Sequence, residues 1–167
     1  MLLLMDETTS WMRVAAVRAQ DPKVVALLEA LTAELAGSGY TPDQTFGYSV
    51  EQLERADVHL VGACVAGRLV GLGGVELQGR GVAELKRFYV EPDHRGTGVA
   101  DALIAALVDH AIAHEVNVVR LETGDKQQAA MSFYRRHGFA EVPRFEPYLS
   151  SETSVCMQRE LVAVDRT

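Results

Sequence analysis

The chain has 167 residues, of which 48% are hydrophobic and 23% are charged, proportions that exclude a disordered or fibrous chain. The formal net charge of −7 gives the molecule as a whole little electrostatic support for binding nucleic-acid phosphates. The length predicts a single domain over residues 1–167.

The N-terminal stretch MLLLMDETTSW has an apolar run of only five residues, with no positive charge before it. Such a run is too short for the hydrophobic part of a signal peptide or for a membrane span. We therefore expect a cytoplasmic protein that does not associate with membranes.

The first half of the chain predicts strands around a helix. Residues 12–18 predict a strand, and residues 21–39 predict a helix with Asp21 as N-cap and a glycine stop. A short helix near 49–55 precedes a β-hairpin over 57–79, and residues 82–90 add a third strand to an antiparallel meander.

The second half alternates helices and strands. Apolar residues three and four apart predict a long helix over 98–114 with one face on a sheet. A strand over 116–123 and a helix over 127–137 follow, and the last strands lie near 139–142 and 154–161. This order predicts a mixed α+β fold.

Two glycines stand immediately before the long helix, in the string HRGTGVA. Gly96 and Gly98 allow a sharp turn that brings backbone N–H groups to the helix N-terminus, and Arg95 adds a positive charge. A diphosphate would suit such a site, but a tight strand-to-helix turn without a ligand explains the two glycines equally well.

Two other phosphate-binding motifs are disfavoured. The string G-x-x-x-x-G-K-[ST] of a Walker A loop does not occur in the sequence. A Rossmann fingerprint needs a third small residue where Asp101 stands, and it belongs near the start of a parallel sheet.

Arg95, Gly98 and Ala100 fit the signature Arg/Gln-x-x-Gly-x-Gly/Ala, and the chain here resembles the GNAT superfamily of acyl-CoA-dependent N-acyltransferases. The block LETGDKQQAAMSFYRRHGF, residues 121–139, resembles a second element of that family, which ends in Y-x-x-x-G-F. The closing PYLSSETSVCMQREL resembles a branch of small bacterial members that share L-E-T-G and S-V-C-M strings. The resemblance covers about residues 57–161.

The resemblance implies a fold and a cosubstrate. The GNAT-like fold has a mostly antiparallel mixed sheet of six to seven strands, flanked by about four helices, with a splay between the fourth and fifth strands. Acetyl-CoA would be the cosubstrate, with its pantetheine arm along Phe88, Tyr89 and Val90. The N–H near Phe88 would polarise the thioester carbonyl. The pyrophosphate would be bound by the loop of Arg95, Gly96, Thr97, Gly98, Val99 and Ala100.

Tyr134 matches the family tyrosine that faces the leaving sulfur, and Gln127 matches an amide that touches the cofactor arm. Since the pKa of tyrosine is about 10 and that of a thiol about 8.5, full proton transfer is uphill by roughly 2 kcal/mol. We therefore expect Tyr134 to act as a hydrogen-bond donor, unless its pKa is lowered. The alternative for Tyr134 is a half-buried helix tyrosine without a catalytic role. The alternative for Gln127 is a polar residue at a helix N-terminus.

An alkylamine must lose a proton before it can attack, so a general base is needed. Glu84 and Glu122, on neighbouring strands, are the candidate catalytic carboxylates, although Glu84 could instead form a structural ion pair with Lys86. Glu146 and Tyr148 would either border the acceptor or lie in an exposed loop.

The remaining residues indicate no metal site and no redox site. His110 and His114 are four residues apart but lack the glutamate of H-E-x-x-H, and His94 precedes the loop as a single histidine. Cys64 and Cys156 are expected to be buried free thiols.

The sequence therefore predicts an N-acetyltransferase that moves an acetyl group from acetyl-CoA to a primary amine by direct attack in a ternary complex. The acceptor is a small-molecule amine or a protein amine, with no metal, and the protein is a monomer or a homodimer. One alternative is a non-catalytic acyl-CoA-binding regulatory module. The other is an acyltransferase that uses another acyl-CoA or an oxygen acceptor.

Overall fold

The computed structural model describes residues 11–161. The N-terminal run from which the cellular location was predicted lies almost wholly outside these residues, in positions 1–10. Within the described range, no helix has both the length and the apolar character that a membrane span needs.

In the described part of the chain, seven strands form one sheet in the order β1-β2-β3-β4-β5-β7-β6. All neighbouring pairs are antiparallel except β4 and β5, which are parallel. This confirms the mixed, mostly antiparallel sheet. The strands are β1 (Met12–Ala16), β2 (Val58–Val65), β3 (Arg68–Gly79), β4 (Val82–Val90), β5 (Val118–Gly124), β6 (Ala140–Val142) and β7 (Ser154–Glu160).

Within residues 11–161, four α-helices accompany the sheet, as predicted. Asp21 caps the first helix by accepting a hydrogen bond from the Lys23 N–H at 2.9 Å. Two short 3-10 helices, Pro42–Gln44 and Pro92–His94, were not predicted, whereas every other element begins and ends within two residues of its predicted range. The helices are α1 (Pro22–Gly37), α2 (Val50–Leu53), α3 (Val99–Ala113) and α4 (Gln128–Arg136).

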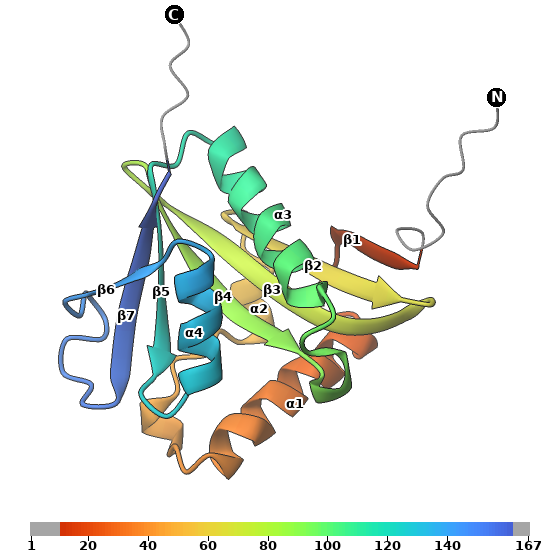
Figure 1. Cartoon of the computed structure of the whole chain (residues 1–167), viewed down its shortest axis with the longest axis horizontal. Coiled ribbons are helices and arrows are strands. Elements are labelled where there is room, and N and C mark those ends of the chain that lie inside the picture. Colours follow the sequence, from red (N-terminus) through yellow and green to blue (C-terminus); the bar gives the residue numbers. More distant parts are fainter. Residues whose placement is uncertain (1–10, 162–167) are drawn as a thin grey trace, which may run out of the picture.

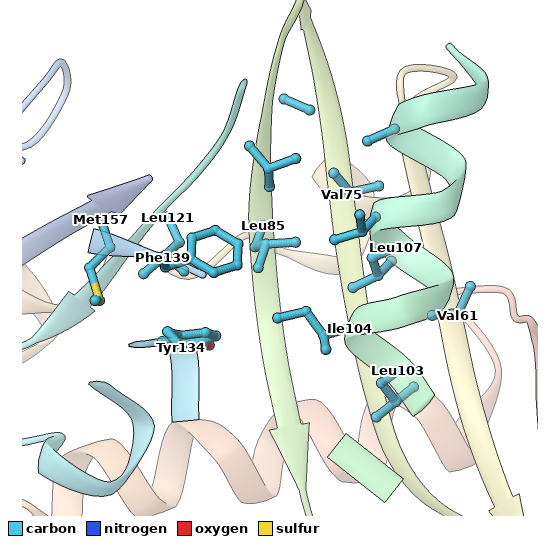
Figure 2. Packing of buried hydrophobic residues seen from close by; sticks show 14 of the residues in the cluster. Val61, Val75, Leu85, Leu103, Ile104, Leu107, Leu121, Tyr134, Phe139 and Met157 are labelled. Atoms are coloured by element: carbon cyan, nitrogen blue, oxygen red, sulfur yellow. The ribbon is translucent and has the colours of Figure 1, made fainter. Parts of the chain in front are cut away.

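The helices cover the two faces of the sheet separately. On one face α3 and α4 pack against the strands in a cluster that includes Leu107, Leu121 and Tyr134 (Figure 2). On the other face α1 and α2 pack against side chains such as Leu72 and Tyr89. In Figure 1, α3 and α4 lie in front of the sheet and α2 lies behind it.

β4 and β5 are paired over a short stretch only. Val82–Glu84 pair with Val118–Arg120, whereas β4 continues to Val90 and β5 to Gly124. The two strands lie side by side at one end and diverge toward the other (Figure 1). The predicted splay between the fourth and fifth strands is confirmed, and it leaves one edge of β4 free of β5.

Candidate active site

A pocket lies where β4 and β5 separate. Its walls include residues 85–88 of β4 and 121–124 of β5, together with side chains of α1, of the loop after α1, and of α4. Because successive side chains of a strand point to opposite faces of a sheet, paired strands would keep these groups apart. The gap therefore brings side chains from both faces into one pocket.

Phe88 is placed by a β-bulge in β4. Gly73 of β3 faces two residues, Arg87 and Phe88, and Arg87 has a φ of 55°. A Cβ on Gly73 would lie 2.8 Å from Cδ2 of Phe88, so this glycine leaves room for the ring. A bulge leaves a residue unpaired, which makes main-chain groups available to a ligand. The sequence does not reveal it, because an arginine with positive φ has no local signal.

The loop before α3 has the geometry of an anion site. Gly96 and Gly98 have φ values of 73° and 92°, and no heavy atom lies within 4 Å of a Cβ built on either. Ala102 donates to the carbonyl of Gly98 at 3.1 Å, and the N–H groups before it in the helix have no carbonyl one turn back. These N–H groups and the helix dipole favour an anion, although the tight turn alone would also require the glycines.

The Arg95 side chain is held by the protein itself. Its Nε donates to the carbonyl of Val90, and its Nη2 donates to Oε2 of Glu34, both at 2.9 Å. The guanidinium also lies 5.6 Å from the centre of the Tyr89 ring. Arg95 therefore joins the loop to β4 and α1, and Glu34 offsets the positive charge that the sequence assigned to the phosphate site.

Tyr134 lies in the pocket wall and is 8% exposed. Its ring packs edge-on against Phe88 and Phe139, and no described residue forms a hydrogen bond with its hydroxyl. Burial, and then the charge of Glu122, raise the Tyr134 pKa above its usual value. The hydroxyl therefore stays protonated, and full proton transfer from it becomes still less favourable.

Gln127 precedes α4 and also lines the pocket. Its side chain makes no capping hydrogen bond to the helix. Gln127 stands at a helix N-terminus, as its alternative interpretation expected, and it also lines the pocket that Tyr134 lines.

Glu84 lies in a buried ion pair and is not part of the pocket wall. It is 1% exposed, and its Oε2 accepts hydrogen bonds from the Lys86 ammonium and, at 2.7 Å, from the Tyr148 hydroxyl. Arg120 lies 3.6 Å from the other oxygen. This placement matches the alternative interpretation of Glu84, a structural ion pair.

Glu122 is the other predicted carboxylate, and it does line the pocket. Its Oε1 accepts a hydrogen bond of 2.8 Å from Oγ of Ser154. Burial raises the Glu122 pKa, the Ser154 hydrogen bond lowers it, and the charges of Glu84 and Lys86 act in opposite directions. A partly buried carboxylate with a raised pKa is a suitable proton acceptor for an amine.

Aromatic side chains make up much of the pocket wall, and half of them were not predicted. Tyr148 is buried against Phe46, so the exposed-loop interpretation was wrong for Tyr148, whereas Glu146 is exposed. No spacing in the sequence connects these rings, because they come from distant segments. The six aromatic residues of the wall are Tyr40, Phe46, Tyr48, Phe88, Tyr134 and Tyr148.

The histidines and cysteines lie outside the pocket wall. His110 stacks with His114 and, at 3.9 Å between ring centres, with His59 of β2. His94 lies 3.8 Å from a carboxylate oxygen of Glu91. Among residues 11–161, no three His, Cys, Asp or Glu side chains are arranged to hold a metal ion.

The free thiols differ in burial. Cys156 is buried as expected, whereas Cys64 is only half-buried.

The amino-acid sequence and the fold both have close counterparts among known proteins. Residues 24–139 match the model of the acetyltransferase (GNAT) family. An IAA acetyltransferase of Azospirillum brasilense is 31% identical over 139 residues, which are 83% of this chain and 90% of that protein.

Two solved structures illustrate the similarity of fold. A Klebsiella pneumoniae protein assigned to the acyl-CoA N-acyltransferases superposes with a TM-score of 0.74 at 30% identity, over 90% of this chain and 98% of its own. The PaiA N-acetyltransferase of Thermoplasma acidophilum, solved in complex with coenzyme A, has a TM-score of 0.71 at 14% identity, over 90% and 99%. With the family model matching most of its length, this chain belongs to the GNAT family of acetyltransferases.

Proposed function

We propose that the protein is an N-acetyltransferase that moves the acetyl group of acetyl-CoA to a primary amine by direct attack in a ternary complex. The observation that carries this proposal is the presence of Glu122 and Tyr134 in one pocket, at the gap between β4 and β5. A base for the amine and a donor for the leaving group are the two proton-handling groups that such a transfer needs.

The residues that would hold acetyl-CoA fit its chemistry. The loop from Arg95 to Ala100 offers N–H groups and open space to a pyrophosphate. The free edge of β4 from Phe88 to Val90 offers main-chain groups to an amide-containing arm, except that the Val90 carbonyl already accepts from Nε of Arg95. Gln127 adds a side-chain amide at the pocket. When bound, acetyl-CoA supplies an acyl carbon attached to a sulfur leaving group.

Each residue then has one task. Glu122 takes a proton from the acceptor ammonium so that the nitrogen lone pair can form the new C–N bond. A backbone N–H near Phe88 donates to the carbonyl oxygen as negative charge grows on it. Tyr134 donates a hydrogen bond to the sulfur as the C–S bond breaks, and its raised pKa favours donation over complete transfer.

The acceptor is proposed to be a small-molecule amine, with a protein amine as the other candidate. The aromatic rings of the wall favour an acceptor with a flat or apolar group, because such a group packs well against ring faces and edges. Aromatic amines therefore belong in the first panel of acceptors.

The alternative is a domain that binds acyl-CoA without catalysis. Such a domain needs the loop at Gly98 but neither a carboxylate nor a tyrosine beside the reacting group. The pocket contains both, which favours the enzyme.

The test is calorimetric binding of acetyl-CoA and CoA, followed by thiol release with a panel of amines. We expect micromolar binding by the wild type and its loss in Gly98→Asp, because a carboxylate at the helix N-terminus repels a pyrophosphate. Gly67→Asp is the matched control, since Gly67 also has positive φ and open space but lies in the turn between β2 and β3. A folded wild type that binds neither ligand would refute the proposal.

A further inference from the structure

Two serines continue the hydrogen bonding of Glu122 away from the pocket. Ser154 begins β7 and pairs with Gly124 of β5, two residues beyond Glu122. Its Oγ lies 2.8 Å from Oε1 of Glu122 and 2.7 Å from Oγ of Ser151. Ser154 is 3% exposed and Ser151 is half-buried, so the chain of hydrogen bonds leads from the pocket toward the surface.

The number of hydrogens fixes the direction of this chain. An ionised carboxylate only accepts hydrogen bonds, and a serine hydroxyl has a single hydrogen to donate. Ser154 therefore donates to Glu122, and Ser151 must donate to Ser154. When Glu122 carries a proton, the carboxyl group becomes a donor and the same two contacts can be kept with every direction reversed.

We propose that Ser154 is a positioning residue for Glu122, and that Ser154 and Ser151 carry the proton taken from the acceptor amine out to the solvent. This inference rests on the proposed function. The amine proton first moves to Glu122; the Glu122 proton passes to Ser154, the Ser154 proton to Ser151, and the Ser151 proton to water. After the C–N bond forms, the nitrogen loses a second proton, which neutralises the departing CoA thiolate. One proton is therefore released to solvent per acetyl group transferred, and Glu122 returns to its ionised form.

The electrostatics around Glu122 explain why the hydrogen bond from Ser154 matters for the charge of Glu122. Burial disfavours the charged carboxylate and raises its pKa, and the Ser154 hydrogen bond acts against that effect. Of the charged neighbours from β4, Lys86 lowers the pKa and Glu84 raises it. The other titratable groups that interact with the Glu122 charge are Tyr40, Tyr134, Tyr148 and Cys156, which all have raised pKa values and are neutral near pH 7.

The first experiment needs no acceptor. In the full-length protein labelled with 13C-glutamate, the side-chain carboxyl carbon of Glu122 is identified by its loss in Glu122→Gln and is then titrated by NMR. We expect a higher pKa in Ser154→Ala than in the wild type, and a smaller rise in Ser151→Ala. Ser150→Ala is the matched control, because Ser150 is an exposed neighbour in the same loop, and it should titrate as the wild type does.

An unchanged Glu122 titration in folded Ser154→Ala would overturn the proposal. If Ser154→Ala does not fold, Ser151→Ala decides the question. An unchanged Glu122 titration in Ser151→Ala would mean that Ser151 is not part of the hydrogen-bond chain, and it would also overturn the proposal. A failure of the proposed function has a different signature, namely a wild type that binds no CoA or releases no thiol.

The second experiment measures kcat/KM against pH with an acceptor from the panel. In Ser154→Ala the acid limb should move to higher pH, with a loss of about tenfold on that limb, because a hydrogen bond to the ionised base has been removed. Ser154→Thr keeps the hydroxyl and should retain the wild-type profile. A purely structural serine would change stability while leaving the position of the limb unaltered, and that result would also overturn the proposal.

Discussion

Glu122 and Tyr134 line one pocket although they belong to opposite faces of the sheet. Tyr134 projects from α4 into the hydrophobic cluster that α3 also covers, and Leu121 of β5 belongs to the same cluster (Figure 2). Glu122 follows Leu121 and points to the other face, toward the α1 side. The two groups interact electrostatically because β5 has separated from β4 at that level. A continuous sheet would have kept the proposed base and the proposed donor apart.

Tyr134→Phe should lower kcat by about 10- to 100-fold, the range expected when a hydrogen bond to a developing thiolate is lost. Affinity for CoA should change little, because the ring remains in place against Phe88 and Phe139. Steady-state kinetics and calorimetry on the same preparation check this. Equal turnover in the variant would remove Tyr134 from the mechanism.

Glu122→Gln should lose activity and stay folded, whereas Glu84→Gln should lose stability. Removing the proposed base should lower kcat at least about 100-fold with the protein still folded. Removing Glu84 instead leaves the Lys86 ammonium buried without its anionic partner, which we expect to cost about 3–5 kcal/mol of unfolding free energy. Urea denaturation and thiol-release kinetics on both variants separate the two roles.

The outcome of that pair also tests the choice between the carboxylates. If Glu84→Gln remains stable and loses activity while Glu122→Gln stays active, the base is Glu84 and the assignment made from the pocket is wrong.

The histidine stack predicts a loss of stability in mild acid. Burial, with contributions from His59 and His114, lowers the pKa of His110 from 6.5 to about 4. The unfolded chain therefore binds a proton at His110 that the folded protein does not. Stability from this group is complete above pH about 6.5 and is lost as the pH falls toward about 4.

Thermal unfolding followed by circular dichroism at pH 7 and pH 5 measures this effect. The drop in Tm between the two pH values should be smaller in His110→Gln than in the wild type. His94→Gln, which lies outside the stack, should show the full wild-type drop. An equal drop in His110→Gln would contradict the prediction.

The local elements could be predicted because their signals are local. Asp21 and Pro22 mark the start of α1, and apolar residues three and four apart mark the buried face of α3. The glycines before α3 and the tyrosine of α4 stand at short, fixed spacings, which is why the family resemblance could locate the loop and Tyr134.

The contacts between distant segments could not be predicted. Arg95 is paired with Glu34, 61 residues away, and Tyr148 donates to Glu84, 64 residues away. At such separations no motif or spacing in the sequence indicates which residue is the partner. The bulge at Arg87 belongs to the same class, since it involves the packing of Phe88 of β4 against Gly73 of β3.

The sequence alone thus determined the order of helices and strands, the family and the two candidate carboxylates. Only the tertiary structure places Glu122 in the pocket wall and Glu84 in a buried ion pair. Whether Glu84 or Glu122 faces the pocket depends on where β4 and β5 separate and on which side chains contact each carboxylate. Both are set by contacts between segments that hydrophobic periodicity and motif spacing do not encode.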